Sequence, residues 1–198
     1  MICEICGAEA WYVCGRNGRP VCPRHSRIEV VSKLSFGSSD GYEVREATGS
    51  DMIEIKKLAE YFREGTVFNH LGKEYDITTL PSYVVMANNH FAGALSYSLE
   101  GDALVIVLFN VLPGYQGLGA GKSLMETAKE KAIEEGKSTI LSAVSNDDLP
   151  LIYFYQRNGF QIIGVNTDAV ANRHEVQVGF GGIPRRDEIC LRWVKPQE

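Results

Sequence analysis

A glycine-rich stretch at residues 116–122 carries the residue types best suited to holding a ligand. Glycine occupies every second position from Gly117 to Gly121. Because glycine has no Cβ, the backbone here can approach a ligand closely and direct its N–H groups toward it. The apolar run at residues 103–112 predicts a strand before the stretch, and periodic apolar residues predict a helix after it, ending at Glu135. Unpaired N–H groups and the dipole at the start of that helix favour an anion, so the stretch predicts a phosphate-binding turn.

Three phosphate-binding signatures can be compared with this stretch. The P-loop pattern G-x-x-x-x-G-K-S ends correctly at residues 121–123, but it requires glycine where the chain has Gln116. The dinucleotide fingerprint G-x-G-x-x-G requires glycine where the chain has Lys122. The remaining pattern is Q-x-x-G-x-G, preceded by Val111-Leu112-Pro113. It resembles the acetyl-CoA loop of the GNAT superfamily of N-acetyltransferases, V-x-P-x-x-[Q/R]-x-x-G-x-[G/A].

A second segment supports the same resemblance. Residues 146–150, N-D-D-L-P, and 154–160, F-Y-Q-R-N-G-F, are similar to the N-D-x-x-x…F-Y-x-x-x-G-F segment of the superfamily. The resemblance implies that Asn146 contacts the pantetheine arm of CoA and that the Tyr155 hydroxyl lies beside the thioester sulfur. Taken alone, Asn146 would be interpreted as a helix cap and Tyr155 as a core aromatic. Because both follow the glycine loop in the sequence, we favour the functional roles. Residues 182–189 also resemble a C-terminal segment of some superfamily members.

The resemblance implies an N-acetyltransferase that passes acetyl from acetyl-CoA directly to a primary amine in a ternary complex. Backbone N–H groups of the glycine loop would hold the pyrophosphate. The backbone around Phe109 and Val111 would pair with pantetheine and stabilise the oxyanion. The implied catalytic residue is Tyr155. The implied cofactor-binding residues are Phe109, Val111, Gln116, Gly117, Leu118, Gly119, Ala120, Gly121, Lys122 and Asn146.

The general base and the acceptor are left open by the sequence. Many superfamily members place a glutamate on the strand before the loop, but residues 103–111 contain none. The candidates are Glu74, Asp102, His174 or an ordered water. Residues 64–79 have no clear period and are expected to border the acceptor, with Phe68, His70 and Tyr75 among the candidates there. The alternative function is a zinc-finger interaction module whose second domain binds CoA without transferring acetyl, which Tyr155 disfavours.

A cluster of potential metal ligands lies near the start of the chain. The cluster contains Cys3, Cys6, Cys14, Cys22 and His25. Two C-x-x-[C/H] pairs are the spacing of tetrahedral zinc sites, and Asn17-Gly18 between them predicts a hairpin turn. The segment resembles treble-clef fingers and the HIT and B-box fingers, although Asn17 takes the place of their fourth ligand. We therefore expect one structural zinc on Cys3, Cys6, Cys22 and His25, with Cys14 as an alternative ligand. A redox C-x-x-C is disfavoured because a βαβ context is lacking.

Composition bounds the class of protein. The chain of 198 residues is 44% hydrophobic and 23% charged, which is ordinary for a globular protein. Its formal net charge of −5 argues against general affinity for nucleic acid or anionic membrane. No apolar run is long enough to span a bilayer, and the first residues do not form a signal peptide. We expect a cytoplasmic protein whose partners are an amine acceptor and, through the finger, a protein.

Hydrophobic periodicity predicts the order β-α-β-β-β-α-β-α-β-β over residues 42–195. Asn88-Asn89 predicts a hairpin turn, and Asp51 with Glu54 predicts a capping box at the start of the first helix. The order resembles the GNAT fold, an α+β fold with a mixed, mostly antiparallel sheet flanked by helices. The expected domains are a zinc finger at residues 1–34, a linker at 35–41 and an acetyltransferase domain at 42–198.

Overall fold

The computed structural model describes residues 12–13, 20–21, 42–62, 65–170, 178–179 and 182–196. The predicted zinc ligands Cys3, Cys6, Cys22 and His25 lie outside these ranges, as do Cys14 and His174. Two short strands of the first segment are described, β1 (Tyr12–Val13) and β2 (Pro20–Val21). They pair antiparallel with Tyr12 opposite Val21, as the Asn-Gly turn signal predicts.

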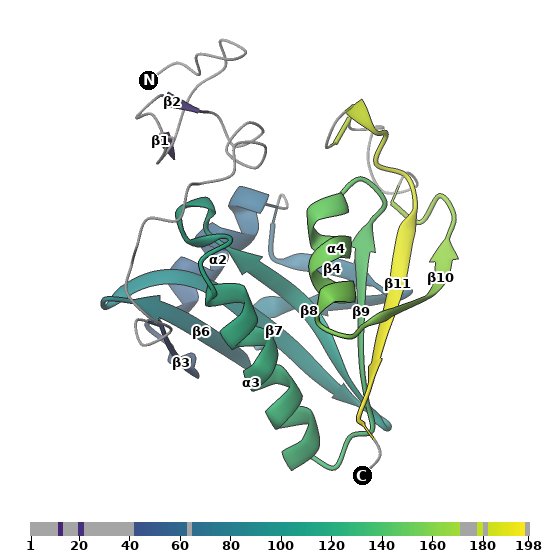
Figure 1. Ribbon diagram of the computed structural model, residues 1–198, viewed down its shortest axis with the longest axis horizontal. Coiled ribbons are helices and arrows are strands. Elements are labelled where there is room, and N and C mark those ends of the chain that lie inside the picture. The colour runs from purple at the N-terminus through teal and green to yellow at the C-terminus, as the bar shows by residue number, and fades with distance from the viewer. Residues whose placement is uncertain are drawn as a thin grey trace.

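A seven-stranded sheet forms the centre of the molecule (Figure 1). In spatial order its strands are β10 (Gln161–Asn166), β11 (Glu188–Val194), β9 (Thr139–Ser145), β8 (Ala103–Val111), β7 (His90–Glu100), β6 (Ser82–Ala87) and β3 (Tyr42–Glu46). Every neighbouring pair is antiparallel except β8 and β9, which run parallel. The mixed, mostly antiparallel sheet predicted from the sequence is thereby confirmed.

Helices cover both faces of this sheet. The three α-helices of the described ranges are α2 (Met52–Phe62), α3 (Ala120–Glu134) and α4 (Leu149–Arg157), and short 3₁₀ turns occupy Ile77–Thr79 and Pro113–Tyr115. Leu104 and Ile106 of β8 pack in the core that includes residues of α3 and α4, whereas Val105 and Val107 pack with α2. Burial on both faces explains why β8 is a continuous apolar run. No helix in the described ranges is long and apolar enough to cross a membrane.

One hairpin in the structure was not predicted from the sequence. Residues 67–76 form a hairpin, β4 (Val67–His70) and β5 (Lys73–Asp76), where no regular structure was predicted. Its turn is built on Leu71 and Gly72, both with positive φ, at 52° and 78°. Leucine seldom takes this conformation, so the sequence lacks the usual turn signal. The hairpin between β6 and β7 does carry that signal, and Asn88 and Asn89 there have φ of 48° and 64°.

The capping box predicted between Asp51 and Glu54 at the start of α2 is wrong, because neither side chain makes the hydrogen bond that it requires among the residues described. The carboxylate of Asp51 instead accepts two hydrogen bonds from the Arg45 guanidinium, at 2.7 and 2.8 Å, and one from the Thr48 N–H at 2.7 Å. Glu54 forms an exposed ion pair with Lys57. The two charge-assisted bonds from the guanidinium hold the carboxylate toward Arg45 and Thr48, on the side of the preceding strand.

Candidate active site

The two parallel strands separate partway along their length. β8 and β9 pair from Ala103 with Thr139 as far as Ile106 with Ser142. β8 then continues to Val111, paired with β7. The β7–β8 register shifts so that Tyr97 faces Ile106 and Ser96 faces Leu108, leaving Val107 as an extra residue. Such a bulge bends its strand, so β8 turns away from β9 and an opening forms between them.

Backbone groups of β8 face this opening. The N–H of Leu112 donates to the carbonyl of Ala92 at 2.8 Å, on the β7 side. Because backbone groups alternate along an antiparallel strand, those of Val111 and Phe109 point the opposite way, toward the opening. The Val111 carbonyl accepts a hydrogen bond from Gln116 Nε2 at 2.7 Å. Gln116 thus fixes the glycine loop to the end of β8, while the Val111 N–H faces the opening.

The glycine loop has the backbone geometry that its composition predicts. Gly117 and Gly119 have positive φ, at 75° and 108°, and Gly119 is the N-cap of α3. A Cβ on Gly121 would lie 3.4 Å from the ring of Phe154, so the loop runs close to α4. The first turn of α3 directs its N–H groups at the space in front of the loop, which favours an anion there.

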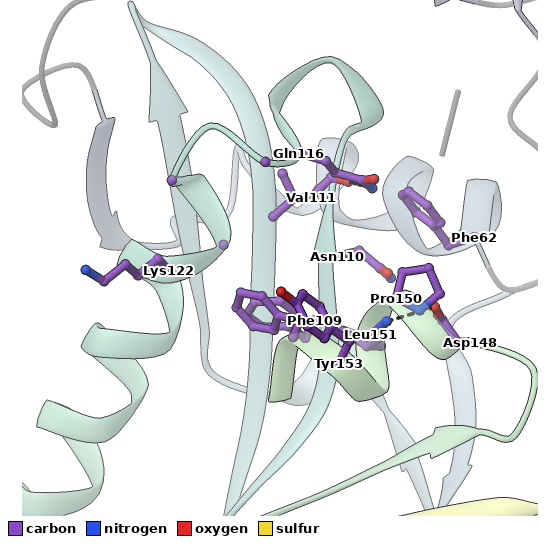
Figure 2. A pocket seen from close by; sticks show the side chains of 14 residues that line it. Phe62, Phe109, Asn110, Val111, Gln116, Lys122, Asp148, Pro150, Leu151 and Tyr153 are labelled. Atoms are coloured by element: carbon purple, nitrogen blue, oxygen red, sulfur yellow. Dashed lines mark hydrogen bonds between the residues drawn. The ribbon is translucent and has the colours of Figure 1, made fainter. Parts of the chain in front are cut away.

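A cleft of about 470 Å³ joins the loop to the opening (Figure 2). Its lining residues are Phe62, Phe109, Asn110, Val111, Gln116, Gly117, Gly119, Gly121, Lys122, Asp148, Pro150, Leu151, Tyr153 and Phe154. Seven of the predicted cofactor-binding residues, Phe109, Val111, Gln116, Gly117, Gly119, Gly121 and Lys122, are brought together here. Leu118 and Ala120 belong to the same turn, and Ala120 is buried in the core beneath it. The rings of Phe109 and Phe154 stack at 5.1 Å between centroids beside the loop.

Tyr155 lies at the point where the strands separate. Its side chain is buried, and its hydroxyl oxygen accepts a hydrogen bond from Ser142 Oγ at 2.9 Å. Ser142 is the last residue of β9 to pair with β8, and its hydroxyl is also 3.4 Å from the Ile106 carbonyl. The rings of Phe109 and Phe160 flank the phenol at 5.9 and 4.9 Å. Sequence reasoning missed Ser142, because a serine inside an apolar strand carries no motif.

Asn146 makes a different set of contacts from the one its motif implies. Its Oδ1 accepts hydrogen bonds from the N–H groups of Arg186 and Asp187, at 2.9 and 3.0 Å. Its Nδ2 donates to the Pro184 carbonyl at 3.0 Å. The side chain therefore fastens residues 184–187 beside the end of β9, and its contact with pantetheine stays a prediction.

The tip of the β4–β5 hairpin closes the other side of the opening. The imidazole Nε2 of His70, a buried residue, accepts a hydrogen bond from the backbone N–H of Ala143 at 3.0 Å. Ala143 is the first residue of β9 beyond its pairing with β8. The buried carboxylate of Glu188 accepts hydrogen bonds from the Leu71 N–H at 3.2 Å and from Asn166 Nδ2 at 2.8 Å. His70 was among the residues expected at the acceptor side, whereas Glu188 was not singled out.

Two of the candidates for general base can be placed. Asp102 precedes β8 at the end remote from the cleft, and its carboxylate binds the N–H and hydroxyl of Ser138. Those hydrogen bonds hold the pKa of Asp102 below its ordinary value. From Ala103 to Phe109 the strand spans about 20 Å at ~3.3 Å per residue, which excludes Asp102 as the base. Glu74 is exposed on β5.

A separated parallel strand pair, followed by a glycine loop at a helix start, is the architecture of an acyl-CoA-dependent acyltransferase. The model of the acetyltransferase (GNAT) family matches residues 50–160. Streptothricin acetyltransferase from Streptomyces lavendulae is 35% identical over 133 residues, 66% of this chain and 68% of that protein. The chain therefore belongs to the GNAT acetyltransferase family, and it is an acetyl-CoA-dependent N-acetyltransferase.

Solved structures share the fold. A GNAT family acetyltransferase from Elizabethkingia anophelis with acetyl-CoA bound superimposes with a TM-score of 0.63 at 18% identity, covering 79% of this chain and 99% of that one. A putative streptothricin acetyltransferase from Bacillus anthracis str. Ames, in complex with acetyl coenzyme A, gives a TM-score of 0.59 at 16% identity, with 78% and 99% covered.

Proposed function

We propose that the cleft binds acetyl-CoA with its pyrophosphate at the glycine loop and its thioester at the opening between β8 and β9. N–H groups of residues 117–122 hold the pyrophosphate, and Lys122 adds a positive charge at that end. The backbone of Phe109 and Val111 pairs with the pantetheine amides. The observation that carries this assignment is the early end of the β8–β9 pairing at Ile106 and Ser142, directly before a glycine loop.

The chemical step uses two groups at the opening. The neutral amine attacks the carbonyl carbon of the thioester, and a backbone N–H of β8 at the opening donates to the oxygen that becomes negative. When the tetrahedral intermediate collapses, the carbon–sulfur bond breaks and Tyr155 gives its proton to the thiolate. The attacking nitrogen loses one proton to solvent and the Tyr155 phenolate takes one proton back from solvent, which restores the acid and balances the step. Phenols have a pKa near ~10 and are matched to protonating a thiolate of pKa ~8.5 or above.

The acceptor is a small amine of the streptothricin kind. This proposal is supported by the similarity to the streptothricin acetyltransferase from S. lavendulae, whose match spans 66% of this chain. The test is release of CoA thiol from acetyl-CoA in the presence of streptothricin, simple alkylamines, and peptides with free N-termini. We expect turnover with streptothricin and alkylamines. Turnover with peptides alone would indicate that the acceptor is a protein. Turnover with none of these amines would favour the alternative function, a domain that binds CoA without transferring acetyl.

The N-terminal segment holds one structural zinc on Cys3, Cys6, Cys22 and His25, and it is a surface for a protein partner. The pairing of β1 with β2 between the two ligand pairs supports a finger-like hairpin. Structural zinc binding contributes folding free energy, so Cys22→Ala should release the metal and leave acetyl transfer to a small amine intact. Elemental analysis should give one zinc per wild-type chain. Zero or two would refute the proposal, and Cys14→Ala tests the alternative ligand.

A further inference from the structure

Two segments that the sequence singled out separately are fastened to each other in the fold. Residues 146–148 connect β9 to α4, and residues 182–187 lead into β11. The Asn146 carboxamide makes three hydrogen bonds to backbone groups of residues 182–187. Its own backbone N–H adds a fourth, to the Asp187 carbonyl at 2.9 Å. Asn146 therefore fixes residues 182–187 against the end of β9.

Asp147 holds the same segment at a second point. Its buried carboxylate accepts a hydrogen bond from Ser145 and forms an ion pair with Arg185, at 3.5 Å between Oδ1 and Nε. A Cβ on Gly179 would collide with this carboxylate, so only glycine lets the backbone pass so close to it. The Gly179 N–H in turn donates to the Ile183 carbonyl at 2.8 Å. The segment is thus fixed at two points.

The segment continues into Glu188, which reaches the tip of the β4–β5 hairpin. Ile189, the next residue of β11, packs against the core shared with α3 and α4. Because side chains alternate along a strand, Glu188 projects to the opposite, α2 face of the sheet. There its carboxylate accepts the Leu71 N–H at 3.2 Å. His70, the residue before Leu71, accepts the Ala143 N–H at the opening, at 3.0 Å. Glu188 therefore links the segment to the hairpin tip.

The hairpin tip lies on the side of the opening from which an amine can approach. Tyr155 packs in the core shared with α3 and α4, and the glycine loop begins α3. With acetyl-CoA in the cleft and its sulfur beside Tyr155, that side of the sheet is occupied. The amine is left with the α2 face, where Phe68 and Tyr75 of the hairpin are buried with α2. Because Asn146 is not among the described residues that line the cleft, its contacts connect it to this acceptor side.

We propose that Asn146 is a positioning residue for the acceptor amine and does not contact pantetheine. By holding residues 182–187, it sets the position of Glu188, and Glu188 sets the position of the hairpin tip that borders the opening. The amine site therefore depends on a residue that neither the amine nor acetyl-CoA touches. This inference rests on the proposed acetyl transfer and names a residue that determines amine binding at the same site.

The test measures the two substrates separately, with streptothricin as the acceptor. Asn146→Ala should raise the KM for streptothricin at least about 10-fold, because a displacement of ~1 Å far from the chemistry can cost ~10²-fold in rate. The Kd of acetyl-CoA, measured by calorimetry, should stay at the wild-type value. Gly179→Ala should give the same pattern, since it displaces the segment without altering Asn146. Melting curves establish that each variant is folded.

Asn158→Ala is the matched control. The Asn158 carboxamide donates to the Phe154 carbonyl at 2.8 Å, at the opposite end of α4 from Asn146. Its removal deletes a hydrogen bond of the same kind, and the KM for streptothricin and the Kd of acetyl-CoA should both be unchanged. An acetyl-CoA affinity that falls in Asn146→Ala, as the motif implies, would overturn the inference. So would a streptothricin KM that stays at the wild-type value in Asn146→Ala or in Gly179→Ala.

Amide hydrogen exchange separates this inference from the proposed function. If the wild-type enzyme acetylates neither streptothricin nor alkylamines, the proposed function fails for these acceptors, but the link from Asn146 to the hairpin can still be measured. Asn146→Ala should speed exchange in residues 182–188 and also in residues 70–73, whereas Asn158→Ala should change neither. Faster exchange confined to residues 182–188 would refute the inference.

Discussion

Ser142 donates a hydrogen bond to the hydroxyl oxygen of Tyr155 at the residue where β9 loses its pairing with β8. The phenol is buried, and this contact fixes the position of its oxygen. The opening between the two strands is where the thioester sulfur is proposed to lie. The Ser142–Tyr155 contact therefore ties the orientation of the proposed acid to the strand geometry that creates the binding site.

The first prediction concerns the acid. Tyr155→Phe keeps the ring and its packing against Phe109 and Phe160 but removes the proton donor. We expect kcat to fall roughly 10²-fold, the lower end of general acid–base contributions, with acetyl-CoA affinity nearly unchanged. Steady-state kinetics and calorimetry measure the two quantities.

Ser142→Ala is the matched second variant for this prediction. It keeps the phenol and removes only the hydroxyl that orients it, so its loss in kcat should be much smaller than that of Tyr155→Phe. If chemistry limits the rate and Tyr155→Phe turns over as fast as wild type, Tyr155 is a packing residue and water protonates the thiolate.

The second prediction concerns the glycine loop. Gly119→Asp places a side chain and a negative charge where the pyrophosphate is proposed to bind, so acetyl-CoA binding should be lost. Gly136→Asp is the control, because Gly136 also has positive φ, at 66°, but lies beyond the C-terminal end of α3. Both variants should lose similar stability through backbone strain, of about 1–3 kcal/mol. If calorimetry shows that Gly119→Asp and Gly136→Asp bind acetyl-CoA equally well, the assignment of the glycine loop as the pyrophosphate site is wrong.

Local signals account for the parts of the structure that were predicted well. The Asn88-Asn89 turn and the glycines at positive φ each follow from conformations that few residues tolerate. The cleft-lining residues around 109–122 were found for the same reason, because strand, turn and helix start are contiguous in sequence.

Contacts between distant segments account for what was missed. His70 meets Ala143 across 73 positions, and Glu188 meets Leu71 across 117. Neither pair has a spacing that periodicity could reveal. Phe62, Asn110 and Asp148 likewise come from three elements and converge only in the fold. The capping box failed because Arg45, in the preceding strand, captured the Asp51 carboxylate.

The third prediction concerns the anchor of the β4–β5 hairpin. His70 gives the N–H of Ala143 a partner at the point where β8 no longer does so. His70→Leu leaves that buried donor unsatisfied and should lower the free energy of unfolding by about 1–3 kcal/mol. Because the hairpin tip borders the opening, kcat/KM for the amine should also fall, while KM for acetyl-CoA stays the same.

Rescue by a similar side chain tests whether this role is positional. His70→Gln offers an amide oxygen at nearly the position of Nε2 and should recover most of the lost activity and stability. If His70→Gln is as inactive as His70→Leu although it is as stable as wild type, His70 acts on the substrate and not on the strand.

The last prediction is a pH dependence of stability. The two hydrogen bonds from Arg45, with those from Thr48, hold the pKa of Asp51 far below its ordinary value. A carboxylate whose pKa is lowered by folding stabilises the protein fully above its unfolded pKa of ~3.9, and this contribution is lost as the pH falls toward the folded value. Asp51→Asn should therefore cost about 1–2 kcal/mol at pH 7, and the difference from wild type should shrink below about pH 4. Glu54→Gln, which breaks an exposed pair with Lys57, should change stability by less than about 0.5 kcal/mol. Urea titrations from pH 7 to pH 3.5 measure both, and a constant difference between Asp51→Asn and wild type over that range would contradict the assignment.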